Sequence, residues 1–585
     1  MNSPLTLLTG TDPARATAWW SRAVIYQVYP RSFADSDGDG IGDLPGITTR
    51  LPYLQTLGVD AIWLSPIYAS PGDDFGYDIS DYQSVDPMFG TLADFDLLVA
   101  EAHSRGIRIV MDLVVNHTSD EHAWFVESAS SVDSAKRDWY WWRQPRTGHQ
   151  PGDDGAEPTN WESFFQGSTW QLDEASGEYY LHLFSRKQPD LNWENPEVRQ
   201  AVYSMMTWWL DRGVDGFRMD VINLISKDPA LPDAVVAPGR RWGDGFEHYG
   251  YGPRVHEFLQ EMHETVFAPR DGDFVTVGEM PGVTVGQARL FTDPSRHELD
   301  MVFQFEHVGL DHGPRGKFDH RTLEVRDLKR SLQRWQDGLA DTGWNSLYWN
   351  NHDQPRAVSR FGDDGRYWAP SAMALGGVLH LQRGTPFIYQ GEELGMTNAP
   401  FVDVADLRDI ESLNYFALAT DVPGADGEQV LGDIRVSTRD NARTPMQWTA
   451  DPGAGFTTGR AWIPENPNHA RINAASQVGV EGSIFEFYRA LIRMRHEDPV
   501  VSEGDFTMLA PDHPTLVAFE RTLGGDALLV LANFSTDETE VEAAIDFTQW
   551  RSGSIRLSNY PGAALEAALR PWELRVIRRA GVPVA

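Results

Sequence analysis

Two charged side chains lie near the end of an otherwise mostly apolar segment in this chain, Val214-Asp-Gly-Phe-Arg-Met-Asp220. If the segment is a strand, Arg218 and Asp220 face the same side, because side chains alternate along a strand. A guanidinium on that side would hold a carboxylate ionised at neutral pH, and an ionised carboxylate at a strand end is what a covalent nucleophile requires. Asp220 is therefore a candidate nucleophile, although a purely structural Arg218–Asp220 pair would leave the same pattern.

Two further carboxylates lie at the ends of predicted strands downstream. Glu279 ends the segment Phe274-Val-Thr-Val-Gly-Glu, and Asp353 follows the segment 346–352. Glycoside hydrolysis needs two carboxyl groups flanking the bond to be cut. Burial would raise the pKa of Glu279, as a general acid requires. Asp353 would then stabilise the positive charge that develops on the sugar ring.

The elements that must position these residues alternate regularly between strand and helix. The predicted strands are 23–29, 59–66, 107–115, 214–224, 274–279, 299–306, 346–352 and 385–392. The predicted helices are 47–57, 91–105, 196–212, 253–267, 323–339, 371–383 and 484–495. Eight strands with seven predicted helices between and after them predict an α/β fold, a (β/α)8 TIM barrel, whose active site lies at the C-terminal ends of the strands.

The barrel prediction brings the candidate residues into one mouth. Asp220, Glu279 and Asp353 come from three strand ends, and His117 and His352 come from two. Three unrelated carboxylates would rarely fall on strand ends by chance. The two histidines suit hydrogen bonds to sugar hydroxyls, although either one alone would more often be structural.

Interruptions of the alternation divide the chain into domains. Residues 117–190 are rich in Gly, Pro, Trp and Asp and too long for a loop without structure of its own, so we expect an inserted subdomain after the third strand. The catalytic barrel then comprises 1–116 and 191–501, with an irregular insertion at about 396–480. Short strands with polar turns predict a C-terminal antiparallel β domain at 502–585, expected to be a β-sandwich.

Composition excludes several classes of protein. The 585 residues include no cysteine, which excludes disulfides and thiolate metal sites. A formal net charge of −36 argues against nucleic acid or an anionic membrane as partner and suits a neutral substrate. No apolar run reaches the ~20 residues of a membrane span, and residues 1–31 lack a signal pattern. We therefore expect a cytoplasmic protein, a monomer or a weak homo-oligomer.

Four ordered motifs together resemble the α-amylase family, glycoside hydrolase family 13. They are Asp112-Leu-Val-Val-Asn-His117, Gly216-Phe-Arg-Met-Asp220, Val277-Gly-Glu279 and Asn350-Asn-His-Asp353. Their order and spacing match over the whole chain, together with the insertion after the third strand and the C-terminal β domain. The resemblance implies a retaining enzyme with Asp220 as nucleophile, Glu279 as acid/base and Asp353 as transition-state stabiliser.

Further stretches are similar to the oligo-1,6-glucosidases and related α-glucosidases within that family. They are Gln188-Pro-Asp-Leu-Asn-Trp-Glu194, Gly278-Glu-Met-Pro-Gly-Val283 and Arg439-Asp-Asn-Ala-Arg-Thr-Pro-Met-Gln-Trp448. The resemblance implies that one group of residues holds the terminal glucose: Asp74, Tyr77 and Arg439. It implies that a second group, from the inserted subdomain, shapes the pocket: Phe165, Phe184 and Gln188. It also associates Val221, directly after the nucleophile, with α-1,6 links.

A separate acidic loop, Asp35-Ser-Asp-Gly-Asp-Gly-Ile-Gly-Asp43, has carboxylates at alternate positions around glycines. Such an arrangement can wrap a hard cation. It is not an EF-hand, because Gly46 stands where the terminal Glu should be. Relatives carry a calcium ion in this loop, which implies a structural Ca²⁺ site; a bare acidic turn is the alternative. The implied ligands are Asp35, Asp37, Asp39, the Ile41 carbonyl and Asp43.

The leading functional interpretation is an exo-acting α-glucosidase that acts on a small oligosaccharide or disaccharide, prefers α-1,6 links and needs no organic cofactor. One alternative is an α-1,4-preferring α-glucosidase. Another is a sucrose isomerase or transglucosidase that uses the same glucosyl-enzyme. A third, from a different class, is a non-catalytic amylase-like partner of a membrane transporter. That class lacks parts of the catalytic set and carries an anchor, and this sequence shows all three carboxylates and no anchor.

Overall fold

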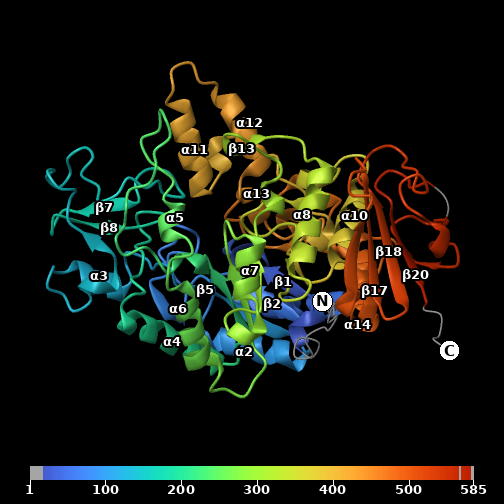
Figure 1. Ribbon diagram of the computed structural model, residues 1–585, viewed down its shortest axis with the longest axis horizontal. Helices are drawn as coiled ribbons and strands as arrows, with labels where there is room; N and C mark the ends of the chain where they lie inside the picture. The colour runs from blue at the N-terminus through green and yellow to red at the C-terminus, as the bar shows by residue number, and fades with distance from the viewer. Residues whose placement is uncertain (1–17, 566–567, 581–585) are drawn as a thin grey trace, which may run out of the picture.

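Eight parallel strands form a barrel at the centre of the computed structural model, which describes residues 18–565 and 568–580 (Figure 1). The strands are β1 (Ile25–Val28), β2 (Ala61–Leu64), β5 (Arg108–Val114), β9 (Gly216–Asp220), β10 (Val275–Glu279), β11 (Met301–Phe303), β14 (Ser346–Leu347) and β15 (Thr385–Tyr389). They pair in chain order, β15 pairs with β1, and a parallel bridge between Val302 and Asn345 links β11 to the start of β14. The predicted (β/α)8 barrel is confirmed.

The barrel strands are buried because both of their faces are covered. All five residues of β9 are buried, as in parallel sheets whose outer face carries helices. This strand is shorter than predicted. It ends at Asp220, because Val221 adopts a left-handed conformation with φ 34° and a 3-10 turn occupies Ile222–Leu224.

The barrel helices match the predicted segments, with one addition. They are α1 (Leu44–Leu57), α2 (Leu92–Ser104), α4 (Pro196–Leu210), α6 (Val255–Met262), α7 (Val285–Phe291), α8 (Val325–Gly338), α10 (Trp368–His380) and α14 (Ile484–Glu497). Local signals mark the helix ends: Thr91 forms a capping box with Asp94 at the start of α2, and Gly58 ends α1 at φ 98°. Helix α7 was not predicted, although Thr284 and Gln287 form a second capping box at its start.

The inserted segment after β5 folds around a small antiparallel sheet. It contains α3 (Ala123–Ala129), β6 (Trp142–Arg143), β7 (Trp170–Asp173) and β8 (Glu178–Leu181), with β8 in the middle of the sheet. Its two ends meet at an antiparallel bridge between His117 and Asp190. The fully buried ammonium of Lys227 ties this junction to the barrel through Asp190 at 2.8 Å and the Asn116 side chain at 3.0 Å.

The second insertion, after β15, contains a helical hairpin. Helices α11 (Ile410–Thr420) and α12 (Gly427–Ser437) project above the barrel (Figure 1). The chain returns through the short helix α13 (Asp440–Arg443). Because this insertion follows a barrel strand at its C-terminal end, its base lies at the mouth of the barrel.

The C-terminal strands form one sheet, which corrects the expected β-sandwich. The strands β16 (Asp505–Leu509), β17 (Leu516–Leu523), β18 (Asp526–Asn533), β20 (Leu574–Arg579) and β19 (Ser554–Ser558) make a single antiparallel sheet within the described residues. One face joins the barrel core, and the other packs under the segment that carries Phe547 and Trp550. No second sheet is needed, since the barrel helices already cover one face.

A buried cation links this sheet to the barrel. Lys329 of α8 donates hydrogen bonds to the carbonyl oxygens of Ala510, His513 and Leu516 at 2.6–3.0 Å. Among the described helices, none is long and apolar enough to cross a bilayer.

Candidate active site

A pocket of about 250 Å³ opens at the C-terminal ends of the barrel strands. Every predicted catalytic carboxylate lines it. The full lining comprises Asp74, Tyr77, His117, Phe164, Phe165, Phe184, Asp220, Val221, Glu279, Pro281, Phe305, Lys317, Asp353, Gln354, Glu411 and Arg439. A larger hollow of about 430 Å³ lies near the N-terminal ends of β10 and β11, the face on which barrel enzymes do not place chemistry.

Arg218 is the electrostatic centre of the pocket floor. Its side chain is 1% exposed, and its Nη1 donates to Asp220 and to Asp112, each at 2.7 Å. Its Nη2 lies 2.7 Å from Glu279 Oε2. The predicted Arg218–Asp220 pair is therefore present. Asp112 was missed as a site residue, although it opens one of the motifs.

Burial and charge together set the ionisation of Asp220. Burial raises the pKa of Asp220 to about 6, with a contribution from Asp112, while Arg218 opposes the shift. The sequence argument expected Arg218 to dominate, so the direction of the shift is a correction. The carboxyl group is still mainly ionised at pH 7, because its pKa lies below 7.

Glu279 is shifted further in the same direction. Burial, with repulsion from Asp220 and Asp353, raises the pKa of Glu279 to about 8, so it carries a proton at neutral pH. Its carboxyl group donates a hydrogen bond to Asp220. The backbone N–H of Val221 donates to Glu279 Oε2 at 3.2 Å. The two carboxyl groups are thus in direct contact and in opposite protonation states.

Asp353 is held ionised by two arginines from the second insertion. Its Oδ1 lies 2.9 Å from Arg443 Nη2 and 3.3 Å from Arg439 Nη1. Although burial opposes ionisation, these cations and His352 hold the pKa of Asp353 well below its usual range. Arg443 was missed, although it lies in the motif that begins at Arg439.

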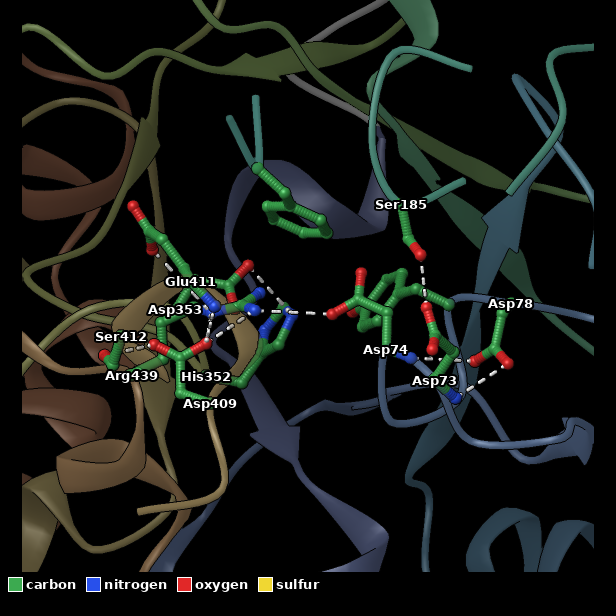
Figure 2. Close-up of polar contacts among 12 residues, drawn as sticks. Asp73, Asp74, Asp78, Ser185, His352, Asp353, Asp409, Glu411, Ser412 and Arg439 are labelled. Atoms are coloured by element: carbon green, nitrogen blue, oxygen red, sulfur yellow. Dashed lines mark hydrogen bonds and ion pairs between the residues drawn. The ribbon is translucent and has the colours of Figure 1, made fainter. Parts of the chain in front are cut away.

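Asp74 and Arg439, both buried, face each other in the pocket (Figure 2). Arg439 Nη2 lies 3.3 Å from Asp74 Oδ1, and Gln188 donates to Asp74 Oδ2 at 3.3 Å. Burial raises the pKa of Asp74 to about 7 against the attraction of Arg439. The loop is fixed by Asp78, which accepts the backbone N–H groups of Asp73 and Asp74.

Both predicted histidines are neutral hydrogen-bonding groups. Burial lowers the pKa of His117 to about 4 and that of His352 to about 3. The Gln27 side chain donates to His352 Nδ1 at 2.8 Å, which leaves the proton on Nε2, the nitrogen beside Asp353. Tyr77 stacks on His352 with ring centroids 5.2 Å apart and donates to Asp112 at 3.0 Å.

Aromatic rings from the inserted subdomain form one wall. Phe184 packs against His117 at 5.1 Å and against Phe165 at 5.7 Å, and Phe165 lies under the Arg439 guanidinium at 5.3 Å. The structure therefore brings every predicted catalytic and substrate-binding residue to the pocket or to its immediate support. The lining also contains Pro281, which lies in the motif that begins at Gly278 but was not named as a site residue. Five further lining residues were indicated by no motif: Phe164, Phe305, Lys317, Gln354 and Glu411.

The acidic loop is only partly assembled as predicted. One carboxylate oxygen each of Asp35, Asp37 and Asp39 lies within 4.8 Å of the others, a donor set that fits a hard cation. Asp43 is outside this group. Its two oxygens accept from Gly46 N, as the N-cap of α1, and from Ser36 N and Oγ.

Comparisons with known proteins agree with this site. The family model described as alpha amylase, catalytic domain, matches residues 27–504. The chain belongs to the α-amylase family and is a glycoside hydrolase.

Individual relatives within this family are similar to the chain over nearly its whole length. The chain is 53% identical to an oligo-1,6-glucosidase of Parageobacillus thermoglucosidasius, over 96% of this chain and 99% of the relative. Among solved structures, a trehalose-6-phosphate hydrolase of Bacillus licheniformis is similar with a TM-score of 0.89 and 44% identity, covering 96% of this chain and 100% of that one. An isomaltulose synthase of Klebsiella sp. LX3 has a TM-score of 0.89 and 40% identity, with coverage of 96% and 99%.

Proposed function

We propose that this protein is a retaining, exo-acting α-glucosidase that releases glucose from the non-reducing end of short α-glucosides and prefers α-1,6 links. The observation that carries the proposal is the contact between Asp220 and Glu279. One guanidinium, that of Arg218, lies 2.7 Å from both carboxyl groups, and burial raises their pKa values to about 6 and about 8. Two carboxyl groups in opposite protonation states supply a nucleophile and an acid.

The proposed mechanism is double displacement. Asp220 attacks the anomeric carbon while Glu279 protonates the leaving oxygen, and the glucosyl-enzyme is then hydrolysed by water that Glu279 deprotonates. Inverting enzymes need a gap of about 6.5–9.5 Å between the carboxyl groups to admit water, and a direct hydrogen bond leaves no such gap. Asp353, held ionised, stabilises the oxocarbenium-like transition state from the other side.

The proposed exo action rests on the part of the pocket lined by the buried residues Asp74 and Arg439. Asp74 and Arg439 face each other there and offer acceptors and donors to the hydroxyls of a terminal glucose. Aromatic rings wall one side, and the cavity of about 250 Å³ suits one sugar ring. A chain that continued past these residues would meet buried ion pairs, so release of single glucose units is expected.

The α-1,6 preference is supported by oligo-1,6-glucosidases about half identical to this chain over nearly their whole length. It is also supported by Val221, which lines the pocket beside Glu279. An isomaltulose synthase is among the similar structures, so an isomerase or transglucosidase with the same glucosyl-enzyme is the second candidate. An α-1,4-preferring α-glucosidase is the third.

We further propose a structural Ca²⁺ in the acidic loop, with Asp35, Asp37 and Asp39 as core ligands and the Ile41 carbonyl and Asp43 completing the set. A cytoplasmic location and a monomeric or weakly associating state are likewise proposals, which cell fractionation and sedimentation would test. The ion would lie in a loop at the start of α1, so its role would be structural rather than catalytic.

Product analysis on isomaltose, maltose and sucrose tests the proposed function. Isomaltose should be the best substrate, and NMR should show α-glucose as the first product. β-Glucose as first product would exclude retention. Isomaltulose or trehalulose as the main product from sucrose would favour the isomerase, and rapid internal cleavage of amylose would exclude exo action.

A further inference from the structure

The shortest contacts of Arg439 are with a residue outside the pocket. Asp409 is fully buried and does not line the cavity, yet its Oδ1 lies 2.7 Å from both Nε and Nη2 of Arg439 (Figure 2). The contacts of Arg439 with the pocket carboxylates Asp74 and Asp353 are both longer, at 3.3 Å. Arg439, which is proposed to bind the terminal glucose, is therefore bound by a carboxylate on the side away from the pocket.

Asp409 is itself fixed from several directions. Ser412 donates to its Oδ2 at 2.7 Å, and the backbone N–H of Glu411 donates to its Oδ1 at 3.2 Å, which makes Asp409 the N-cap of α11. The backbone N–H groups of Arg408 and Asp409 donate in turn to Asp440 Oδ2 at 2.7 and 3.0 Å. Asp440 follows Arg439 directly, so the two chain segments at the base of the α11–α12 hairpin are joined in both directions.

We propose that Asp409 is a positioning residue that sets the orientation of Arg439 and keeps the terminal-sugar site open. Charge-assisted hydrogen bonds normally shorten to about 2.7–2.9 Å. Without Asp409, the guanidinium would close onto Asp74 and Asp353 and occupy donors and acceptors that a sugar needs. With Asp409 in place, Nη1 and Nη2 point at these carboxylates from 3.3 Å. This inference rests on the proposed function, because it assumes that Arg439 faces a bound glucose.

Helix capping is the competing explanation for a buried Asp at this position, and one substitution separates the two roles. Serine caps helices about as well as aspartate, but its short side chain carries no charge and cannot reach the guanidinium. Asp409→Ser therefore removes the ion pair between Asp409 and Arg439 and keeps the N-cap of α11. Asp426 offers a matched control: it is the exposed N-cap of α12 in the same hairpin and accepts from Glu428 N and Gln429 N.

The test compares Asp409→Ser and Asp426→Ser in the full-length protein. Glucose, which fills only the terminal site, serves as inhibitor, and kcat and KM are measured on isomaltose alongside the melting temperature. Asp409→Ser should raise the glucose inhibition constant and KM roughly 10- to 100-fold, the range for a lost hydrogen bond to a charged group, with a smaller change in kcat. Asp426→Ser should leave the glucose constant within about twofold.

Three outcomes are distinct. A folded Asp409→Ser that binds glucose as the wild type does overturns the inference, and so does an equal loss in Asp426→Ser. A wild type that neither binds glucose nor cleaves isomaltose overturns the proposed function instead. If Asp409→Ser does not fold, Asp409→Asn keeps shape and cap while losing the charge. It should raise the glucose inhibition constant by about 3- to 10-fold. An unchanged inhibition constant would again show that Asp409 does not position Arg439.

Discussion

Val221 has a backbone conformation that β-branched residues rarely adopt. Its φ of 34° and ψ of 41° lie in the left-handed region, where such a side chain is strained. The turn directs its N–H to Glu279 Oε2 and leaves its side chain on the pocket surface beside the acid. The strained residue is therefore the one that connects the proposed nucleophile, Asp220, to the part of the pocket beside Glu279, where the leaving sugar would lie.

Replacement of Val221 by threonine tests its part in linkage choice. Threonine has nearly the same shape but adds a hydroxyl that can bond to a leaving glucose lying directly on the rim, as in an α-1,4 link. Pocket differences of this kind are worth about 1–3 kcal/mol, or roughly 10–200-fold in kcat/KM. The isomaltose-to-maltose ratio should fall in Val221→Thr. An unchanged ratio would remove Val221 from the argument.

The opposed ionisation of Asp220 and Glu279 predicts a bell-shaped pH profile of kcat/KM on isomaltose. The pKa of Asp220 is raised to about 6 and that of Glu279 to about 8. Activity should rise through pH 6 as the nucleophile ionises and fall through pH 8 as the acid loses its proton. The two limbs belong to the interacting pair.

A substrate with an activated leaving group provides the control for the alkaline limb. p-Nitrophenolate departs without protonation, so the fall above pH 8 should be weaker for p-nitrophenyl α-glucoside than for isomaltose. Equal alkaline limbs for the two substrates would show that the group titrating there is not the acid.

At the scale of elements, the loop 35–43 is packed closely against the segment 457–462. A Cβ at Gly40, which has φ +97°, would lie 1.9 Å from the Arg460 carbonyl oxygen, and Trp462 N donates to Gly40 O. Thr457 also donates to the Asp35 carboxylate. The loop therefore connects the segment between β1 and α1 to the second insertion.

Chelation tests the proposed ion in this loop. A cation that binds only the folded state stabilises it by about 2.7 kcal/mol at 100 times its dissociation constant. EDTA should therefore lower the melting temperature, and added Ca²⁺ should restore it, while kcat of the folded fraction stays the same. The Asp37→Asn variant should have a lower melting temperature than the wild type, and added Ca²⁺ should raise that temperature by less. An unchanged melting curve, with no metal by elemental analysis, would contradict the site.

At the scale of the whole molecule, the surface is strongly acidic. The chain carries 85 acidic and 49 basic residues and a net charge of −36. Self-repulsion of this size destabilises the compact state, and salt screens it. In the active site, buried arginines pair with the carboxylates, Arg218 with Asp220 and Arg443 with Asp353, so we expect the effect of surface repulsion to fall on stability more than on chemistry.

The melting temperature should accordingly rise with NaCl. Most of the rise should occur below about 0.3 M, because the screening length shortens from ~30 Å at 0.01 M to ~10 Å at 0.1 M. Repeating the titration near pH 5, where part of the carboxylates are protonated, should give a smaller rise. A melting temperature independent of salt, or one that changes only at molar concentrations, would contradict this account.

The sequence alone predicted the barrel and the three candidate catalytic carboxylates. Strand and helix periods are local, and parallel strands of a barrel place their C-terminal ends together, so Asp220, Glu279 and Asp353 could be assigned to one mouth from spacing. The same rule placed His117 and His352 there. Residues of the inserted segments, such as Arg439, became candidates only through resemblance, because no period marks them.

Only the tertiary structure decided how these residues act on one another. Arg218 forms ion pairs with both Asp112 and Asp220, Arg443 pairs with Asp353, and Asp409 pairs with Arg439. These contacts depend on how irregular segments fold over the barrel, which local pattern does not encode. The direction of the Asp220 pKa shift is of the same kind: Arg218 lowers the pKa and burial raises it, and burial prevails because the folded chain leaves the carboxyl group only 7% exposed. The single C-terminal sheet has the same cause, since the barrel rather than a second sheet covers its inner face.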